Sequence, residues 1–194
     1  MTELERERAA LEKLIAEVCE GEKRVLVHGE GDPGARVMLI GEAPGEQETL
    51  LRRPFVGRAG KNLDEFLSLA GIERAQLYVT NTVKYRPTKL SAAGNPVNRP
   101  PTREEISLFL PWLRREIALV RPQVVVTLGN VPLKALMGGR AAIGSLHGAF
   151  AACGDHLLYP MYHPASLIYN RALRPIYETD VRKLADWLKE NHDF

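Results

Sequence analysis

Short apolar segments alternate with helical segments along this chain, and this alternation limits its fold more than any other feature. Apolar runs of strand length occupy residues 36–40, 77–80, 123–128 and 157–162. Amphipathic helices are expected over residues 4–18, 63–70, 102–117 and 177–190, with a short helix over 130–137. Strands that alternate with helices pair in parallel through right-handed crossovers. The sequence therefore predicts an α/β fold, a three-layer α/β/α sandwich around a central four-stranded parallel sheet.

The length of the chain is that of one domain with a substantial core. Its 194 residues are 45% hydrophobic and 26% charged, as in ordinary globular proteins. We expect a single domain over residues 1–194, with residues 1–20 as an N-terminal flanking helix. The net charge of +2 permits nucleic-acid binding but does not indicate it, because a sum does not show clustering.

Membrane insertion and secretion are not expected. The longest apolar runs, residues 37–40 and 124–128, are far shorter than the roughly 20 residues that span a bilayer. The first residues are too acidic for a signal peptide. We therefore expect a cytoplasmic monomer that binds no membrane.

Distinctive residues directly follow the predicted strands. These loops hold residues 41–45, Asn81, residues 129–130 and residues 163–164. Ligands of open parallel sheets bind beyond the carboxyl ends of the strands, where such loops meet. We expect the functional site there.

A second Gly- and Pro-rich segment, residues 53–60, follows the first of these loops and contains Phe55. Glycines let the backbone approach a ligand closely, although tight turns use the same residues. An aromatic ring in such a loop is either part of the core or a platform on which a planar ligand stacks. The residues alone leave both interpretations open.

Together these motifs resemble the fourth family of uracil-DNA glycosylases, in order and in spacing, over roughly residues 25–190. The segments that carry the resemblance are Gly41-Glu42-Ala43-Pro44-Gly45, Arg53-Pro54-Phe55-Val56-Gly57, Thr80-Asn81, Lys84 with Arg86-Pro87, and His163-Pro164-Ala165. The resemblance implies a DNA repair enzyme that flips uracil out of DNA and hydrolyses its N-glycosidic bond, leaving an abasic site.

The resemblance also assigns roles to individual residues of the base pocket. Phe55 would stack on the flipped base, and Asn81 would read its O4 and N3–H, since an amide offers both an acceptor and a donor. His163 would donate a hydrogen bond to O2 as the base leaves with negative charge. Glu42 would position the attacking water or stabilise the cationic sugar.

Two further residues, Gly41 and Ala43, would frame the same pocket with their backbone N–H groups. Base binding is therefore expected from Gly41, Ala43, Phe55, Asn81 and His163, and catalysis from Glu42 and His163.

The loop expected to enter the duplex departs from the family pattern, and reads Ser166-Leu167-Ile168-Tyr169-Asn170-Arg171. Leu167, Ile168 or Tyr169 would fill the space that the flipped base vacates. The expected DNA contacts are Lys84, Arg86, Ser166, Leu167, Tyr169 and Arg171, with Arg174 as a further candidate for a phosphate.

A second departure concerns cysteine. Members of the family hold an iron–sulfur cluster with four cysteines, whereas this chain has only Cys19 and Cys153. The third and fourth cluster positions read Tyr85 and Phe109. We therefore predict no metal and no cofactor, with aromatic packing in place of the cluster.

Two alternative functions stay open at this point. The chain could be a catalytically weak nucleic-acid-binding member of the same fold, or a glycosylase for another deaminated base such as hypoxanthine or xanthine. Fold membership alone does not separate these possibilities.

Overall fold

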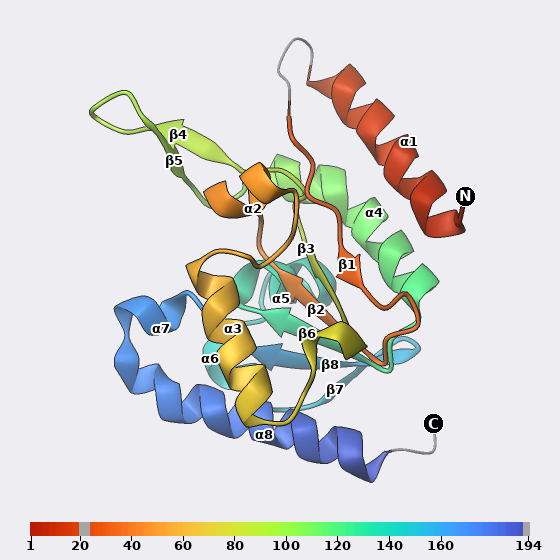
Figure 1. Cartoon of the computed structure of the whole chain (residues 1–194), viewed down its shortest axis with the longest axis vertical. Helices are drawn as coiled ribbons and strands as arrows, with labels where there is room; N and C mark the ends of the chain where they lie inside the picture. The colour runs from red at the N-terminus through yellow and green to blue at the C-terminus, as the bar shows by residue number, and fades with distance from the viewer. Residues whose placement is uncertain (20–23, 192–194) are drawn as a thin grey trace.

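A six-stranded sheet forms the centre of the protein, in the order β1-β3-β2-β6-β8-β7 (Figure 1). The computed structural model describes residues 1–19 and 24–191. The strands of this sheet are β1 (Glu30–Gly31), β2 (Val37–Gly41), β3 (Leu77–Asn81), β6 (Val124–Leu128), β7 (Ala151–Cys153) and β8 (His156–Met161).

The four inner strands, β3, β2, β6 and β8, pair in parallel, and they are the four strands expected from the sequence. The prediction of a parallel four-stranded core is confirmed, but the sheet is wider than predicted. Antiparallel strands β1 and β7 close its two edges. They have only two and three residues, which is too short for a hydrophobic pattern to appear.

Helices cover both faces of the sheet. On one face lie α3 (Arg58–Leu69) and α8 (Arg174–Glu190), and on the other α4 (Arg103–Val120) and α5 (Asn130–Met137) (Figure 1). Side chains of a strand point alternately to opposite faces. Thus Leu39 packs towards α3 and α8, while Met38 and Ile40 pack towards α4. This confirms the three-layer sandwich.

The N-terminal helix α1 (Glu3–Val18) packs on the outer side of α4, where Leu11 and Ile15 contact the cluster that contains Phe109. Thr2 caps this helix by accepting a hydrogen bond from the Glu5 N–H. Residue 20, the last of the expected flanking segment, lies outside the described residues.

Several short elements were not expected from the sequence. They are α2 (Glu46–Leu51), α6 (Ile143–Leu146), α7 (Ser166–Tyr169), the 3₁₀ helices η1 (Arg74–Gln76) and η2 (Arg171–Leu173), and a hairpin of β4 (Thr88–Leu90) and β5 (Pro96–Asn98). Among them, α2, α7 and the hairpin lie towards the carboxyl ends of the parallel strands (Figure 1). No helix in the described part of the chain is long and apolar enough to cross a bilayer.

Candidate active site

A pocket of about 320 Å³ opens beyond the carboxyl ends of β2, β3 and β8. Its lining includes Ala43, Phe55, Asn81, His163 and Tyr169, which come from four separate parts of the sequence. A larger cavity, about 520 Å³, lies at the other end of the sheet between the starts of β2 and β3 and the helix α8, and none of these five residues lines it. The smaller pocket is therefore the candidate active site.

The floor of this pocket follows from the pairing of β2 with β3, which sets Gly41 beside Asn81. A Cβ atom at position 41 would lie 2.4 Å from Asn81 Oδ1 and 2.5 Å from Phe55 Cζ, so only glycine fits there. Asn81 is 2% exposed, and no described residue hydrogen-bonds its side-chain amide. The amide therefore keeps both its donor and its acceptor for a ligand.

Phe55 forms a wall of the pocket. Its ring centroid lies 6.0 Å from that of His163, with 30° between the ring planes. The Phe55 backbone is left-handed, with φ of 53°, which a bulky residue adopts only when its surroundings enforce it. The ring belongs both to the core and to the pocket, so the two interpretations of Phe55 are not exclusive.

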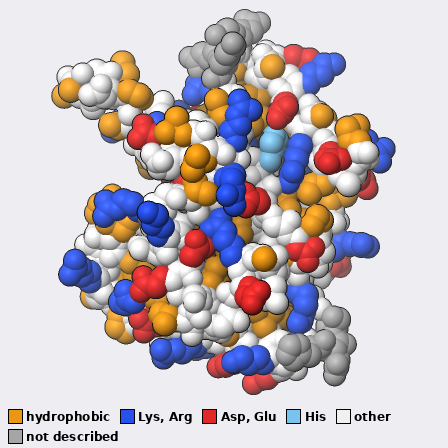
Figure 2. Space-filling view, in the orientation of Figure 1, with side chains coloured by type: hydrophobic (Ala, Val, Ile, Leu, Met, Phe, Trp, Pro, Cys, Tyr) orange, Lys and Arg blue, Asp and Glu red, His pale blue; other side chains and the backbone are white. Residues whose placement is uncertain are grey.

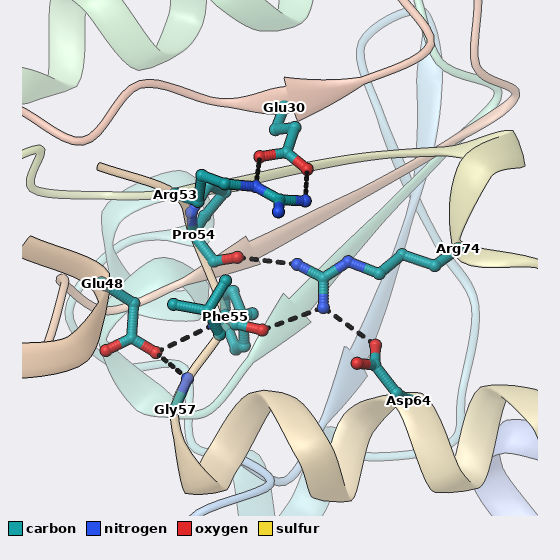
Figure 3. Close-up of polar contacts among 9 residues, drawn as sticks. Glu30, Glu48, Arg53, Pro54, Phe55, Gly57, Asp64 and Arg74 are labelled. Atoms are coloured by element: carbon teal, nitrogen blue, oxygen red, sulfur yellow. Dashed lines mark hydrogen bonds and ion pairs between the residues drawn. The ribbon is translucent and has the colours of Figure 1, made fainter. Parts of the chain in front are cut away.

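Arg74, the first residue of η1, holds the backbone at Phe55 (Figure 3). Its guanidinium donates hydrogen bonds to the carbonyl oxygens of Pro54 at 2.6 Å and Phe55 at 2.9 Å. It also pairs with Asp64 at 2.8 Å. These charge-assisted bonds fix the backbone of the loop.

Glu48 holds the same loop from its other side (Figure 3). Its carboxylate accepts hydrogen bonds from the backbone N–H groups of Val56 at 3.1 Å and Gly57 at 2.8 Å. The other carboxylate oxygen accepts from Gly45 N–H at 3.2 Å. One side chain thus joins the loop after β2 to the loop that carries Phe55.

The hydrogen bonding of His163 defines its tautomer. The Ala165 N–H donates to Nδ1 at 3.1 Å, so in the neutral ring the proton is on Nε2. Burial lowers the pKa of His163 to about 4, and the nearby charge of Glu48 only partly opposes this shift. The imidazole is therefore neutral near pH 7, with an N–H donor available to the pocket.

Glu42 is half-buried directly after β2, and it is not among the residues that line the pocket. Burial raises the pKa of its carboxyl group. No side chain in the described part of the chain pairs with it. Its neighbour Ala43 does line the pocket.

One of the expected DNA contacts, Lys84, is wrong. Lys84 is 2% exposed, because its ammonium forms an ion pair of 2.5 Å with Glu116 of α4 and donates to Thr80 Oγ1. Leu167 packs in the hydrophobic core between the sheet and α8. The Lys84 ammonium is therefore not presented to a partner. Leu167 is 8% exposed and lines a hollow of about 470 Å³ together with Arg58 and Arg171, so its contact with DNA stays a prediction.

The remaining expected DNA contacts lie near the pocket. Tyr169 is 88% exposed at its rim, and Arg171 is exposed beyond it. Arg86 pairs with Glu46 at 3.2 Å, and Ser166 Oγ donates to the carbonyl oxygen of His163 at 2.5 Å. Arg174 is occupied by ion pairs with glutamates of α3 and α8.

Comparison with known proteins identifies the family. The sequence model of the uracil DNA glycosylase superfamily matches residues 28–189. The chain belongs to this superfamily. It is similar to the type-4 uracil-DNA glycosylase of Sulfurisphaera tokodaii, with 38% identity over 91% of this chain and 84% of that protein. The type-4 uracil-DNA glycosylase of Pyrobaculum aerophilum is 39% identical over 80% of this chain and 79% of its own length.

A solved structure shares the fold of this superfamily member. The SMUG2 protein of Pedobacter heparinus matches with a TM-score of 0.56, covering 82% of this chain and 77% of its own, at 14% identity. At that identity the match bears on fold alone, and it agrees with the three-layer sandwich described above.

The expected cluster positions of this superfamily member hold a packed aromatic pair. The rings of Tyr85 and Phe109 meet edge to face with centroids 5.4 Å apart. Cys19 ends α1 beside them, while Cys153 lies in β7 against the α4 face of the sheet. The two thiols therefore lie in different hydrophobic clusters of the protein. The residues at the expected iron–sulfur positions do not fit a site with four thiolate ligands.

The sequence did not indicate several residues that line or shape the pocket of this superfamily member, among them Glu48, Arg58, Arg74 and Asn98. A signal existed for Glu48, which stands three residues after Gly45 at a helix start, a place where Glu often caps. Asn98 follows closely on Gly94-Asn95-Pro96, a run typical of a loop, so its position beside the pocket depends on a hairpin that the sequence pattern does not reveal.

Proposed function

We propose that this chain is a monofunctional uracil-DNA glycosylase that excises flipped uracil from DNA during repair. The observation that carries the proposal is the convergence of Phe55, Asn81 and His163 on one pocket at the carboxyl ends of parallel strands. The names of its type-4 relatives support the same activity. Flipping a base requires a stacking surface and a reader of its pairing edge, and the pocket has candidates for both.

Base recognition is assigned to Phe55 and Asn81. The ring of Phe55 replaces the stacking that the base loses on leaving the duplex. The free amide of Asn81 donates to uracil O4 and accepts from N3–H, which is the opposite of what cytosine requires.

Departure of the base is assigned to His163. Because Nδ1 is occupied by the Ala165 N–H, the Nε2–H is the donor that meets uracil O2. As the glycosidic bond breaks, negative charge develops on O2, and a fixed donor in a partly buried site stabilises it. The low pKa of His163 means that this donor is a neutral imidazole, which needs no proton from solution.

Water attack at the sugar is assigned to Glu42, whose carboxylate would position the nucleophile or stabilise the cationic sugar. Glu42 is half-buried beside the pocket, next to the lining residue Ala43. No lysine is required, since water rather than an amine cleaves the bond.

DNA contact is assigned to the rim formed by α7 and the residues after it. Tyr169 projects from the rim, and Arg171 lines a neighbouring hollow of about 470 Å³ together with Arg58. Cationic side chains near a groove of this kind favour the phosphate backbone. Arg86 and Ser166 complete the proposed contacts.

We also propose that the protein holds no iron–sulfur cluster, because Tyr85 and Phe109 fill two of the places where thiolates are needed. Iron analysis after anaerobic purification tests this. The expected result is a colourless protein with substoichiometric iron, and one cluster per chain would contradict it.

The activity is tested with duplexes that carry a single uracil, hypoxanthine or xanthine opposite each normal base. After incubation and alkali, we expect breaks at uracil. Breaks at hypoxanthine or xanthine alone would favour another deaminated base. DNA binding without breaks would favour a binding protein. Both results would overturn the proposal.

Variants of the pocket then test the assigned roles. We expect Asn81→Asp to weaken discrimination for uracil, and His163→Ala to slow cleavage more than it weakens binding. Glu42→Gln is expected to slow cleavage without loss of binding. His156→Gln, at the other end of β8, is the matched histidine control and should retain activity. An unchanged single-turnover rate in His163→Ala would remove the role of His163.

A further inference from the structure

The hairpin of β4 and β5 stands away from the body of the protein (Figure 1), and its residue Asn98 lines the candidate active site. Most of its side chains are exposed, and Leu90 is 73% exposed. Figure 2 shows hydrophobic side chains on this projecting arm. A two-stranded hairpin with no core of its own is marginally stable in water, so its attachment and its exposed side chains call for an explanation.

The pairing of the strands assigns each side chain to a face. Thr88 pairs with Asn98, Lys89 with Val97, and Leu90 with Pro96. Directly opposed residues share a face, and faces alternate along a strand. Leu90 and Pro96 therefore lie on the same face as Asn98, whereas Val97 lies on the other face.

The face with Asn98 is the face towards the pocket. Asn98 lines the pocket, and its Oδ1 accepts a hydrogen bond of 2.6 Å from Arg86 Nε. Arg86 in turn pairs with Glu46, which also lines the pocket. Leu90 and Pro96 thus continue the pocket wall outwards along the hairpin.

The base of the hairpin is braced against α4. Arg99 donates from Nε to the carbonyl oxygen of Thr88 at 3.1 Å and holds Glu105 with both terminal nitrogens. At the tip, Ser91 N–H donates to the carbonyl oxygen of Asn95 at 2.8 Å. The arm is therefore held in a defined direction before any partner arrives.

Charge along this segment is of one sign. Residues 82–103 contain basic residues and no Asp or Glu. Lys89 is exposed on the hairpin, and no described residue pairs with it. Arg86 and Arg99 pair with glutamates, and Lys89 lies on the same face as Val97, away from the pocket. An arm without negative charge and with an apolar face towards the pocket suits a polyanion whose bases and sugars are apolar surfaces.

We propose that this hairpin is a second DNA-contacting arm, whose Leu90–Pro96 face packs on duplex DNA beside the flipped nucleotide. The proposal rests on the proposed function. Tyr169 of α7 and Asn98 at the base of the hairpin both line the pocket, and α7 and the hairpin lie well apart in Figure 1, so the two elements would bracket the flipped nucleotide.

The position of Leu90 and Pro96 on the hairpin sets how far from the flipped nucleotide their contact with DNA should fall. Leu90 and Pro96 lie two residues along their strands from the Asn98 pair, about 7 Å at the rise of an antiparallel strand. That length is about two nucleotide steps of a DNA strand at roughly 3.4 Å each.

Site-specific crosslinking tests the contact directly. Benzoylphenylalanine is placed at position 90, 97 or 169, and each protein is irradiated with a duplex that carries non-hydrolysable 2′-fluoro-2′-deoxyuridine. We expect position 90 to crosslink within about three nucleotides of the uridine. Position 169 should crosslink elsewhere around the uridine, and position 97 should give little product. Equal yields from 90 and 97, or none from 90 while 169 reacts, would overturn the proposal.

Affinity gives the second measurement. Leu90→Ser should weaken binding to an abasic-site duplex about fivefold, since part of a leucine side chain loses its burial. Val97→Ser, the matched change on the opposite face, should stay within about twofold of wild type. If both variants behave alike, the proposal fails.

The two proposals fail in different ways. If the protein cleaves uracil but Leu90→Ser and Val97→Ser have equal affinity for DNA, the glycosylase proposal holds and the proposal about the hairpin fails. If position 90 crosslinks next to the uridine but the protein cleaves no uracil, the proposal about the hairpin holds and the glycosylase proposal fails.

Discussion

The guanidinium of Arg74 donates a 2.9 Å hydrogen bond to the carbonyl oxygen of Phe55, the residue whose left-handed backbone turns its ring into the pocket. A left-handed conformation is unfavourable for a residue with a large side chain, and it persists only where neighbouring groups enforce it. Arg74 is therefore a positioning residue, which acts on the pocket through the backbone of Phe55 without lining the pocket itself.

Replacing Arg74 with Ala tests this link. The Pro54 and Phe55 carbonyl oxygens would lose their charged donor, which we expect to cost about 2 kcal/mol of unfolding free energy. The ring would also lose its fixed position, which should lower the single-turnover rate constant for uracil cleavage between about 10-fold and 100-fold.

The matched control for this prediction is Arg53→Ala. Arg53 forms an ion pair with Glu30 in the same region, but that pair is at the surface and neither residue lines the pocket (Figure 3). Cleavage by this variant should equal that of wild type. If Arg53→Ala and Arg74→Ala reduce the rate equally, Arg74 has no special part in placing Phe55.

The low pKa of His163 predicts a dependence of stability on pH. In the unfolded chain the imidazole protonates near pH 6.5, whereas in the folded protein burial holds its pKa at about 4. The neutral ring therefore contributes stability that is fully present above pH 6.5 and is lost as the pH falls from 6.5 towards 4. Urea unfolding of wild type and His163→Gln across this pH range gives the unfolding free energy of each protein. The contribution of His163 is the difference between the two slopes of unfolding free energy against pH.

Titration of His163 by NMR gives an independent check. The ring resonances that disappear in His163→Gln should titrate with a midpoint near pH 4. The ratio of cleavage rates of wild type and variant should show no inflection between about pH 6 and 8, since the ring stays neutral there. A midpoint near 6.5 would mean that the pocket is more hydrated than its geometry indicates.

Sequence alone predicted the parts of the site that depend on strand order. Parallel strands bring their carboxyl ends together, so Gly41, Asn81 and His163 were expected at one edge of the sheet. Gly41 pairs with Asn81, and Asn81 and His163 line the same pocket. What escaped prediction depends on contacts between distant residues. The burial of Lys84 follows from Glu116, 32 residues away, and the conformation of Phe55 from Arg74, 19 residues away.

The hairpin was missed for a different reason. Its strands have three residues each and contain or adjoin Pro, Gly and Asn, so the local composition is that of a loop. Pairing across the turn, together with the bracing by Arg99, makes the segment regular, and neither feature leaves a periodic pattern in the sequence.

The aromatic pair at the expected cluster positions predicts a large effect of Phe109→Ala. Phe109 is fully buried between α1 and α4, so its removal leaves a cavity that should cost about 3–5 kcal/mol. Tyr85→Phe keeps the ring and loses only the 2.7 Å hydrogen bond to Glu105, at about 1 kcal/mol. Equilibrium urea unfolding measures both. A cost below 1 kcal/mol for Phe109→Ala would show that this pair does not hold α1 in place.

The buried pair of Lys84 and Glu116 separates a structural role from a role in DNA binding. Burial opposes the charge of Glu116, but Lys84 and the hydroxyl groups of Tyr78 and Thr80 together lower the pKa of its carboxyl group. Lys84→Met would leave this carboxylate buried without its cation, and we expect a loss of about 3–5 kcal/mol of unfolding free energy.

Removing both charges should be less harmful than removing one. In Lys84→Met with Glu116→Leu no unpaired charge is left, so this double variant should be more stable than Lys84→Met alone. The dependence of DNA affinity on salt should be the same in the double variant as in wild type, because a buried ammonium releases no counterion from DNA. Arg171→Ala, which removes an exposed charge beside the pocket rim, should reduce that dependence by about one unit of slope. A reduced slope in the double variant would return Lys84 to the DNA interface and contradict its place in the core.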